Sequence, residues 1–148
     1  MLDLSRRRVR IQSHLRRLGM RFSRPANLST RARAALGENA AARFAEFRQY
    51  RDGWDFGRGR RLSAGSVRAL ERFVDAGPCF PTRPSLFLTQ DGMLELAWED
   101  HAGRRVEVEL LPGCYLYFVE GEHDDEGVFE PRQVPALLAH LGLEGESE

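Results

Sequence analysis

The 148-residue sequence contains no lysine, so all 22 of its basic residues are arginines. Phosphate-binding loops of the Walker type place a lysine after their glycines, and this chain has none to place there. The two cysteines, Cys79 and Cys114, are 35 positions apart, so there is no C-x-x-C redox or metal motif. We expect both cysteines to act as small hydrophobic residues and not to form a disulfide.

Long apolar runs are also missing. No stretch approaches the roughly 20 residues that a membrane-spanning helix needs. The opening residues, MLDLSRRRVRIQSHLRRL, carry arginines without the apolar block and small-residue cleavage site of a secretory signal. We therefore expect a cytoplasmic protein that does not contact a membrane.

The four histidines are scattered and form no catalytic set, and neither G-x-S-x-G nor H-E-x-x-H occurs. His123 does lie beside Asp124 and Asp125, whose carboxylates suit a divalent cation. The segment lacks the ligand spacing of an EF-hand loop, so we interpret it as a solvated acidic loop. We expect no metal, no cofactor and no enzymatic activity, and keep a small metal-dependent enzyme using Asp124 and Asp125 as a lesser alternative.

The net charge of zero hides a division along the chain. Residues 1–77 hold 18 arginines and 7 acidic residues, whereas residues 78–148 hold 4 arginines and 15 acidic residues. The first 36 residues alone hold 10 arginines and one acid, Asp3. The forked guanidinium group suits phosphates and carboxylates. Such asymmetry indicates a polyanionic partner, an acidic protein surface, or docking of the protein's own opposite charges.

Apolar residues recur with the helical period at four places. The expected helices cover residues 4–18, about 30–50, 63–76 and 131–141, with Ser63 as a good N-cap and Gly77-Pro78 as a stop. The loop YRDGWDFGRGRRLS, residues 50–63, joins the second and third helices. We interpret it as a connector in which Trp54 packs on the core, with Phe56 and the nearby arginines able to contact a partner.

Between residues 85 and 120 the period changes to two. The expected strands cover residues 85–90, 93–99, 104–110 and 114–120, with an Asp91-Gly92 hairpin turn between the first two. Short links make neighbouring strands antiparallel. Leu96 and Val108 share an apolar face, and glutamates occupy the other. An acidic loop, residues 120–127, follows the fourth strand.

The fold class predicted from these elements is α+β. A four-stranded antiparallel β-meander is covered on its apolar face by helices 63–76 and 131–141, and an Arg-rich helical region precedes it. The predicted organisation is a basic helical region at 1–50, an α+β domain at 51–143 and a disordered tail at 144–148. The pattern leaves open whether the first helices pack on the sheet or project from it.

Several short motifs between Tyr50 and Val119 resemble a group of small bacterial proteins. They are a Gly-Trp-Asp loop (Gly53, Trp54, Asp55), a Leu62-Ser63 helix start, Ala69-Leu70, a hairpin with Asp91-Gly92, Leu96 and Trp98, and a VEVE strand at 106–109. Phe56 stands where that pattern has a second glycine. The resemblance covers about half of the chain and implies an antitoxin-like or accessory role in bacterial conflict or defence systems.

These observations favour a non-enzymatic interaction protein that binds a protein partner, such as a basic toxin or nuclease, through charged surfaces. The alternative is a DNA- or RNA-binding protein that uses its arginines, and homo-oligomers remain open. The candidate residues for nucleic-acid or partner binding are Arg6, Arg7, Arg8, Arg10, Arg16, Arg17, Trp54, Arg58, Arg60 and Arg61. The candidate acidic partner-binding face consists of Glu95, Glu99, Glu107, Glu109, Asp124 and Asp125.

Overall fold

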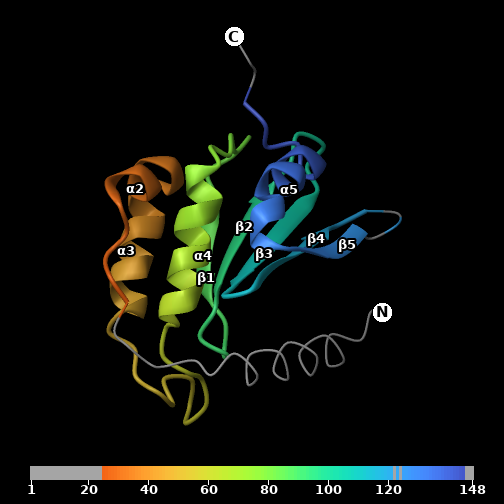
Figure 1. Cartoon of the computed structure of the whole chain (residues 1–148). Helices are drawn as coiled ribbons and strands as arrows, with labels where there is room; N and C mark the ends of the chain where they lie inside the picture. The colour runs from red at the N-terminus through yellow and green to blue at the C-terminus, as the bar shows by residue number, and fades with distance from the viewer. Residues whose placement is uncertain (1–24, 122, 124, 146–148) are drawn as a thin grey trace.

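A five-stranded antiparallel sheet with helices against one face forms the protein in its computed structural model (Figure 1). The structure describes residues 25–121, 123 and 125–145. The α+β class is therefore confirmed, while the strand number was one too low. The predicted helix at 4–18 and its arginines lie outside the described residues.

The predicted helix over residues 30–50 is two helices, α2 (Thr30–Leu36) and α3 (Glu38–Phe47). Gly37 separates them with a φ of +90°, a conformation that side chains with a Cβ rarely adopt. Ser29 caps α2 by accepting a hydrogen bond from the Ala32 N–H. The prediction of one continuous helix was wrong because this glycine turns the chain.

Helix α4 (Ala64–Asp75) begins at the predicted N-cap, Ser63, whose hydroxyl accepts from the Ser66 N–H. The expected stripe is buried: Val67, Leu70, Phe73 and Val74 each expose 5% or less of their surface. The helix ends before Gly77, which has a φ of +76°. Capping and apolar spacing were thus sufficient signals for this element.

The sheet follows chain order: β1 (Ser85–Leu88), β2 (Leu94–Glu99), β3 (Arg105–Leu111), β4 (Cys114–Val119) and β5 (Asp125–Phe129). The first four strands confirm the predicted meander. The fifth corrects the predicted acidic loop at 120–127, because Asp125, Glu126 and Gly127 pair with β4. These residue types have low strand propensity, and tertiary pairing overrides it at a short, charged edge strand.

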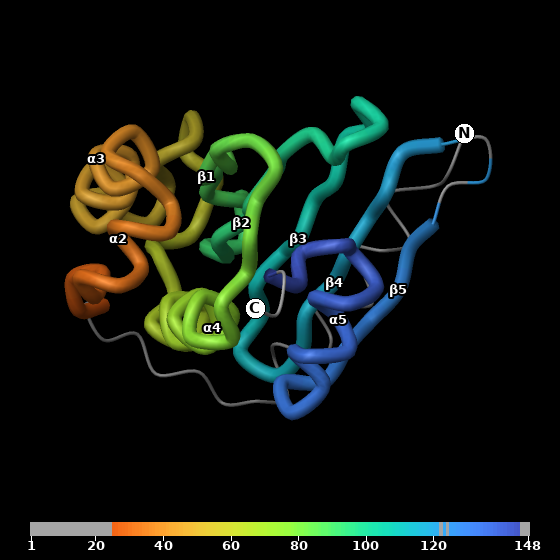
Figure 2. The backbone as a smooth tube through the Cα atoms, turned by 90° about the horizontal axis from the view of Figure 1, so that it is seen from above, coloured from red at the N-terminus to blue at the C-terminus, as the bar shows by residue number. Residues whose placement is uncertain are grey.

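Helices α4 and α5 lie on the same side of the sheet, while α2 and α3 lie beside α4 near β1 (Figure 2). Helix α5 (Val134–His140) follows a 3-10 turn, η1 (Pro131–Gln133), so the first turn of the predicted helix 131–141 is irregular. One hydrophobic cluster runs from Leu28 through the sheet to Leu143. The first described helices therefore share the core of the sheet. We call the side of the sheet that carries α4 and α5 the covered face, and the opposite side the second face.

Candidate partner-binding surfaces

The loop between α3 and α4 contains a tight turn at Asp55–Arg58. Asp55 and Arg58 exchange two main-chain hydrogen bonds, of 2.8 and 2.9 Å. Phe56 and Gly57, at the tip, have φ values of +50° and +84°. Positive φ at both central residues is typical of the type I′ hairpin turn, which favours asparagine and glycine. The loop therefore ends in a small hairpin.

Phe56 is fully exposed at this tip, with a relative accessibility of 102%. Among the described residues it is also the one non-glycine residue with a positive φ. A bulky side chain in this region costs on the order of 1–3 kcal/mol and persists only where the surroundings enforce it. Neither burial nor backbone preference explains phenylalanine here, so the ring is a candidate contact residue.

Trp54 supports the turn from within the loop. Its indole Nε1–H donates a hydrogen bond of 2.8 Å to the carbonyl oxygen of Arg60, and its ring lies 5.3 Å from that of Tyr50. A Cβ at Gly59 would come within 2.8 Å of the Trp54 ring, so a glycine is needed for this close approach. Trp54 is only half-buried, and its polar group is engaged inside the loop.

The loop is also fastened to the β1–β2 hairpin. The N–H of Arg60 donates to the carbonyl of Gln90 at 2.8 Å, and the Gln90 amide donates to Asp55 at 2.5 Å. The Arg61 guanidinium lies 3.6 Å from the Asp52 carboxylate. Arg58 and Arg60 have exposed side chains close to Phe56 in the chain. The loop thus presents an aromatic ring and cations on a rigid support.

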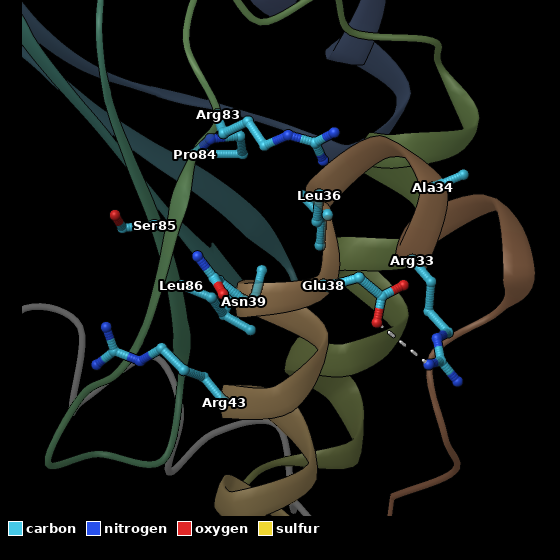
Figure 3. Close-up of a pocket in the computed structure, with 12 residues that line it drawn as sticks. Arg33, Ala34, Leu36, Glu38, Asn39, Arg43, Arg83, Pro84, Ser85 and Leu86 are labelled. Carbon is cyan, nitrogen blue, oxygen red and sulfur yellow. Dashed lines mark ion pairs between the residues drawn. The ribbon is translucent and has the colours of Figure 1, made fainter.

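A second basic region surrounds a cavity of about 630 Å³ between the α2–α3 junction and β1 (Figure 3). Arg33 of α2, Arg43 of α3 and Arg83, which precedes β1, line it. The Arg83 guanidinium occupies the space where a Cβ at Gly37 would lie. These arginines are far apart in the sequence, and no local motif relates them, which is why sequence reasoning missed this cavity.

The cavity already contains groups that partly satisfy its charges. Arg33 pairs with Glu38 at 3.9 Å, drawn as a dashed line in Figure 3. Arg43 lies 4.7 Å from the centre of the Phe87 ring, a cation–π contact. The Glu38 carboxylate also stands in the first turn of α3, where the helix dipole favours an anion. The cavity is a basic surface with one built-in acid.

The glutamates of the predicted acidic face do lie together on the second face. Glu95 pairs directly with Glu109 across β2 and β3, and Ala97 pairs with Glu107. Glu99 lies opposite Arg105. Arg105 donates to Glu107 at 2.6 Å, and this hydrogen bond and the glutamate charge raise the pKa of the arginine. The face is therefore acidic, with one arginine engaged inside it.

Asp125 does not belong to this face. It pairs with Val119 on the covered face, where its carboxylate accepts a hydrogen bond from the Tyr117 hydroxyl at 3.0 Å and contacts His140 Nε2 at 2.5 Å. Burial acts to raise the pKa of Asp125, but the hydrogen bonds from His140 and Tyr117 outweigh it, and the pKa is lowered. Asp125 thus contacts α5 through His140.

The remaining candidates divide in two groups. Six predicted arginines and Asp124 lie outside the described residues: Arg6, Arg7, Arg8, Arg10, Arg16 and Arg17. Trp54, Arg58, Arg60 and Arg61 share the loop described above. The sequence indicated Phe56 as a possible partner contact and showed that it replaces an expected glycine; its positive φ and its full exposure come from the structure.

Comparison of the chain with protein families, with curated proteins and with solved structures found no match. Cys79 and Cys114 are free thiols. Within the described part of the chain, no three His, Cys, Asp or Glu side chains are grouped so that they could hold a metal ion. No helix described between residues 25 and 145 has the length and apolarity that crossing a membrane requires.

Proposed function

We propose that the protein is a non-enzymatic interaction protein that binds a protein partner through charged surfaces, with the Phe56 loop as its central contact. Because its short motifs resemble those of antitoxin-like bacterial proteins, we propose a toxin or nuclease of a conflict or defence system as the kind of partner. The observation that supports this proposal is the exposed phenylalanine held at positive φ on a hydrogen-bonded turn.

An aromatic ring in this setting suits recognition for two reasons. Burying a phenylalanine side chain contributes about 1.5–3 kcal/mol, and phenylalanine and arginine are both enriched at protein interfaces. The turn is also fixed before binding by its own hydrogen bonds, so little conformational entropy is lost on association. The complement of Phe56, Arg58 and Arg60 is an apolar pocket rimmed by carboxylates.

The test uses full-length protein as bait in its native host, beginning with the product of the adjacent gene. A partner recovered with the wild type is purified and titrated against Phe56→Ala and Arg58→Glu by calorimetry. We expect each variant to weaken binding at least tenfold, or about 1.4 kcal/mol. Arg68→Glu, at an exposed arginine of α4 outside the proposed contact, is the matched control for Arg58→Glu and leaves the affinity unchanged. A partner that binds wild type and Phe56→Ala equally contradicts the proposal.

Nucleic-acid binding is the second candidate function, and the gathering of Arg33, Arg43 and Arg83 around one cavity favours it. Phosphate contacts weaken steeply as salt rises, because bound counterions are released. Fluorescence anisotropy with labelled DNA and RNA from 50 to 300 mM salt tests this function. We expect the triple alanine variant of these arginines to bind weaker and with a shallower salt slope. No binding at the lowest salt excludes it.

A further inference from the structure

The second face of the sheet is not an ordinary solvated face, because apolar side chains lie on it together with its glutamates. One row across the five strands reads Phe87, Glu95, Glu109, Leu116 and Val128. The next row contains Ala97, Glu107 and Phe118. A face that only needed to meet water would not carry Leu116, Phe118 and Val128 beside each other on β4 and β5.

Burial on this side is uneven. Met93 and Leu111 form a small cluster with Cys114 and Leu116, separate from the main core, and they expose only 0% and 2% of their surface. Val128, on the edge strand, is 62% exposed. Helices α4 and α5 lie on the opposite side of the sheet (Figure 2). Among the described helices, α3 reaches only the β1 edge of the second face, where Arg43 lies over the Phe87 ring.

We propose that the second face binds residues 4–18 of the same chain. The sequence predicts an amphipathic helix there, with an apolar stripe of Leu4, Ile11, Leu15 and Leu18. At 100° per residue, Arg7 and Arg8 would flank this stripe on either side. The stripe matches the apolar residues of the face, and the flanking guanidinium groups match Glu95, Glu107 and Glu109.

The charge and the length of the N-terminal segment match those of the second face. Residues 1–24 contain eight arginines and a single acid, whereas β2 and β3 present four glutamates and one arginine to the second face. A helix of 15 residues is about 22 Å long, close to the roughly 19 Å width of five paired strands. Residues 19–24, which can span up to about 20 Å, join this segment to Pro25 beside α4.

This contact makes the basic segment an internal ligand of the acidic face. A basic partner of that face has to displace residues 4–18, and nucleic acid has to compete with the glutamates for their arginines. The inference does not depend on the Phe56 loop or on the proposed partner, because every interaction in it is within one chain. Its test therefore needs only the purified full-length protein.

Cys114 provides a native reporter, because it lies half-buried on the second face. In a Cys79→Ser background, we measure the rate at which N-ethylmaleimide modifies Cys114. Two variants of the segment are compared with this protein: Arg7→Glu with Arg8→Glu, and Ile11→Glu with Leu15→Glu. We expect both to raise the Cys114 rate at least tenfold, and 1 M salt to raise the rate in the parent protein, since salt screens exposed ion pairs.

The controls isolate the contact. Arg51→Glu with Arg68→Glu changes the net charge by the same amount at two exposed positions and leaves the Cys114 rate unchanged. In a Cys114→Ser background, the exposed Cys79 reacts at one rate in all variants, which shows that the fold is intact. Equal Cys114 rates in the parent and both segment variants overturn the proposal. Protection that appears only at high concentration, with a dimer in sedimentation, overturns it in favour of exchange between two copies.

Discussion

The hydroxyl of Ser66 donates a hydrogen bond of 2.6 Å to the main-chain carbonyl of Leu110. The same oxygen accepts from the Leu94 N–H at 2.8 Å. One fully buried side chain of α4 thus satisfies a donor on β2 and an acceptor on β3. This bridge fixes the helix to the sheet at the end where the Asp91-Gly92 hairpin meets the loop of Phe56.

Ser66→Ala is expected to lower the free energy of unfolding by about 2–3 kcal/mol, because it leaves buried main-chain groups without a partner. Urea unfolding followed by circular dichroism measures the change. Ser63→Ala is the comparison, since loss of an N-cap typically costs about 1 kcal/mol. If Ser66→Ala costs no more than Ser63→Ala, the main-chain groups have found other partners.

Alanine substitutions at Gly92 and Gly103 distinguish the cost of backbone strain from the cost of steric overlap. Both have similar φ values, +80° and +75°. A Cβ at Gly92 would lie 2.3 Å from the carbonyl oxygen of Arg61, whereas nothing lies within 4 Å of one at Gly103. Gly103→Ala is expected to cost about 1 kcal/mol from backbone strain, and Gly92→Ala at least about 2 kcal/mol more from overpacking. Equal losses in urea unfolding would show that the loop moves away without cost.

Local patterns predicted most of the fold. The N-cap at Ser63 and the alternation through β2 and β3 each act within a few residues, and both predictions held. The hairpin at Asp91-Gly92 also forms, but its turn has three residues between Thr89 and Met93, and not the predicted two. Strand β5 was not predicted from the sequence, because Asp125, Glu126 and Gly127 have low strand propensity. They form a strand because they pair with β4. The separation of α2 from α3 at Gly37 was not predicted, because a single glycine within a helical pattern is usually tolerated.

The candidate surfaces were less predictable, since they depend on distances between remote segments. Arg33, Arg43 and Arg83 line one cavity only after α2, α3 and β1 pack together. The alternation of glutamates predicted their shared face, because register follows the pleat. Asp125, grouped with them by composition, faces His140 instead, because the parity of β5 follows from its pairing with β4.

Low pH should lower the free energy of unfolding, partly through protonation of Asp100. Its carboxylate accepts from the N–H groups of Ala102 and Arg104, each at 2.9 Å, and from the Arg104 guanidinium at 2.8 Å. Burial acts to raise the pKa of Asp100, but these hydrogen bonds from Arg104 and Ala102 prevail and lower it. A carboxyl whose pKa is lower in the folded state stabilises the fold above its unfolded value, about 3.9. That contribution is lost as the pH falls through the folded pKa.

Asp100→Asn keeps the side-chain oxygen and removes the charge, so it tests the acid dependence directly. We expect the variant to be less stable than the wild type at pH 7, and the difference to shrink by more than half at pH 2.5. Urea unfolding at pH 7, 5, 3.5 and 2.5 gives the two curves. A difference that stays constant across this range would mean that geometry, and not ionisation, accounts for the stabilisation.

Phe56 gives the sharpest separation of function from stability. Because its ring is fully exposed, Phe56→Ala removes the contact surface while keeping a Cβ at positive φ, and the free energy of unfolding should stay within about 0.5 kcal/mol of the wild type. Phe56→Asn also removes the ring but suits the type I′ turn, and should stabilise the protein by about 0.5–1 kcal/mol.

Both Phe56 variants should lose affinity for the partner equally, since both lack the ring. Stability is measured by urea unfolding and affinity by calorimetry on the same preparations. The expected pattern, a more stable protein that binds less well, is the mark of strain retained for recognition. If both variants are instead clearly less stable than the wild type, the ring packs on the loop in solution, and its exposure at the tip has no role in binding.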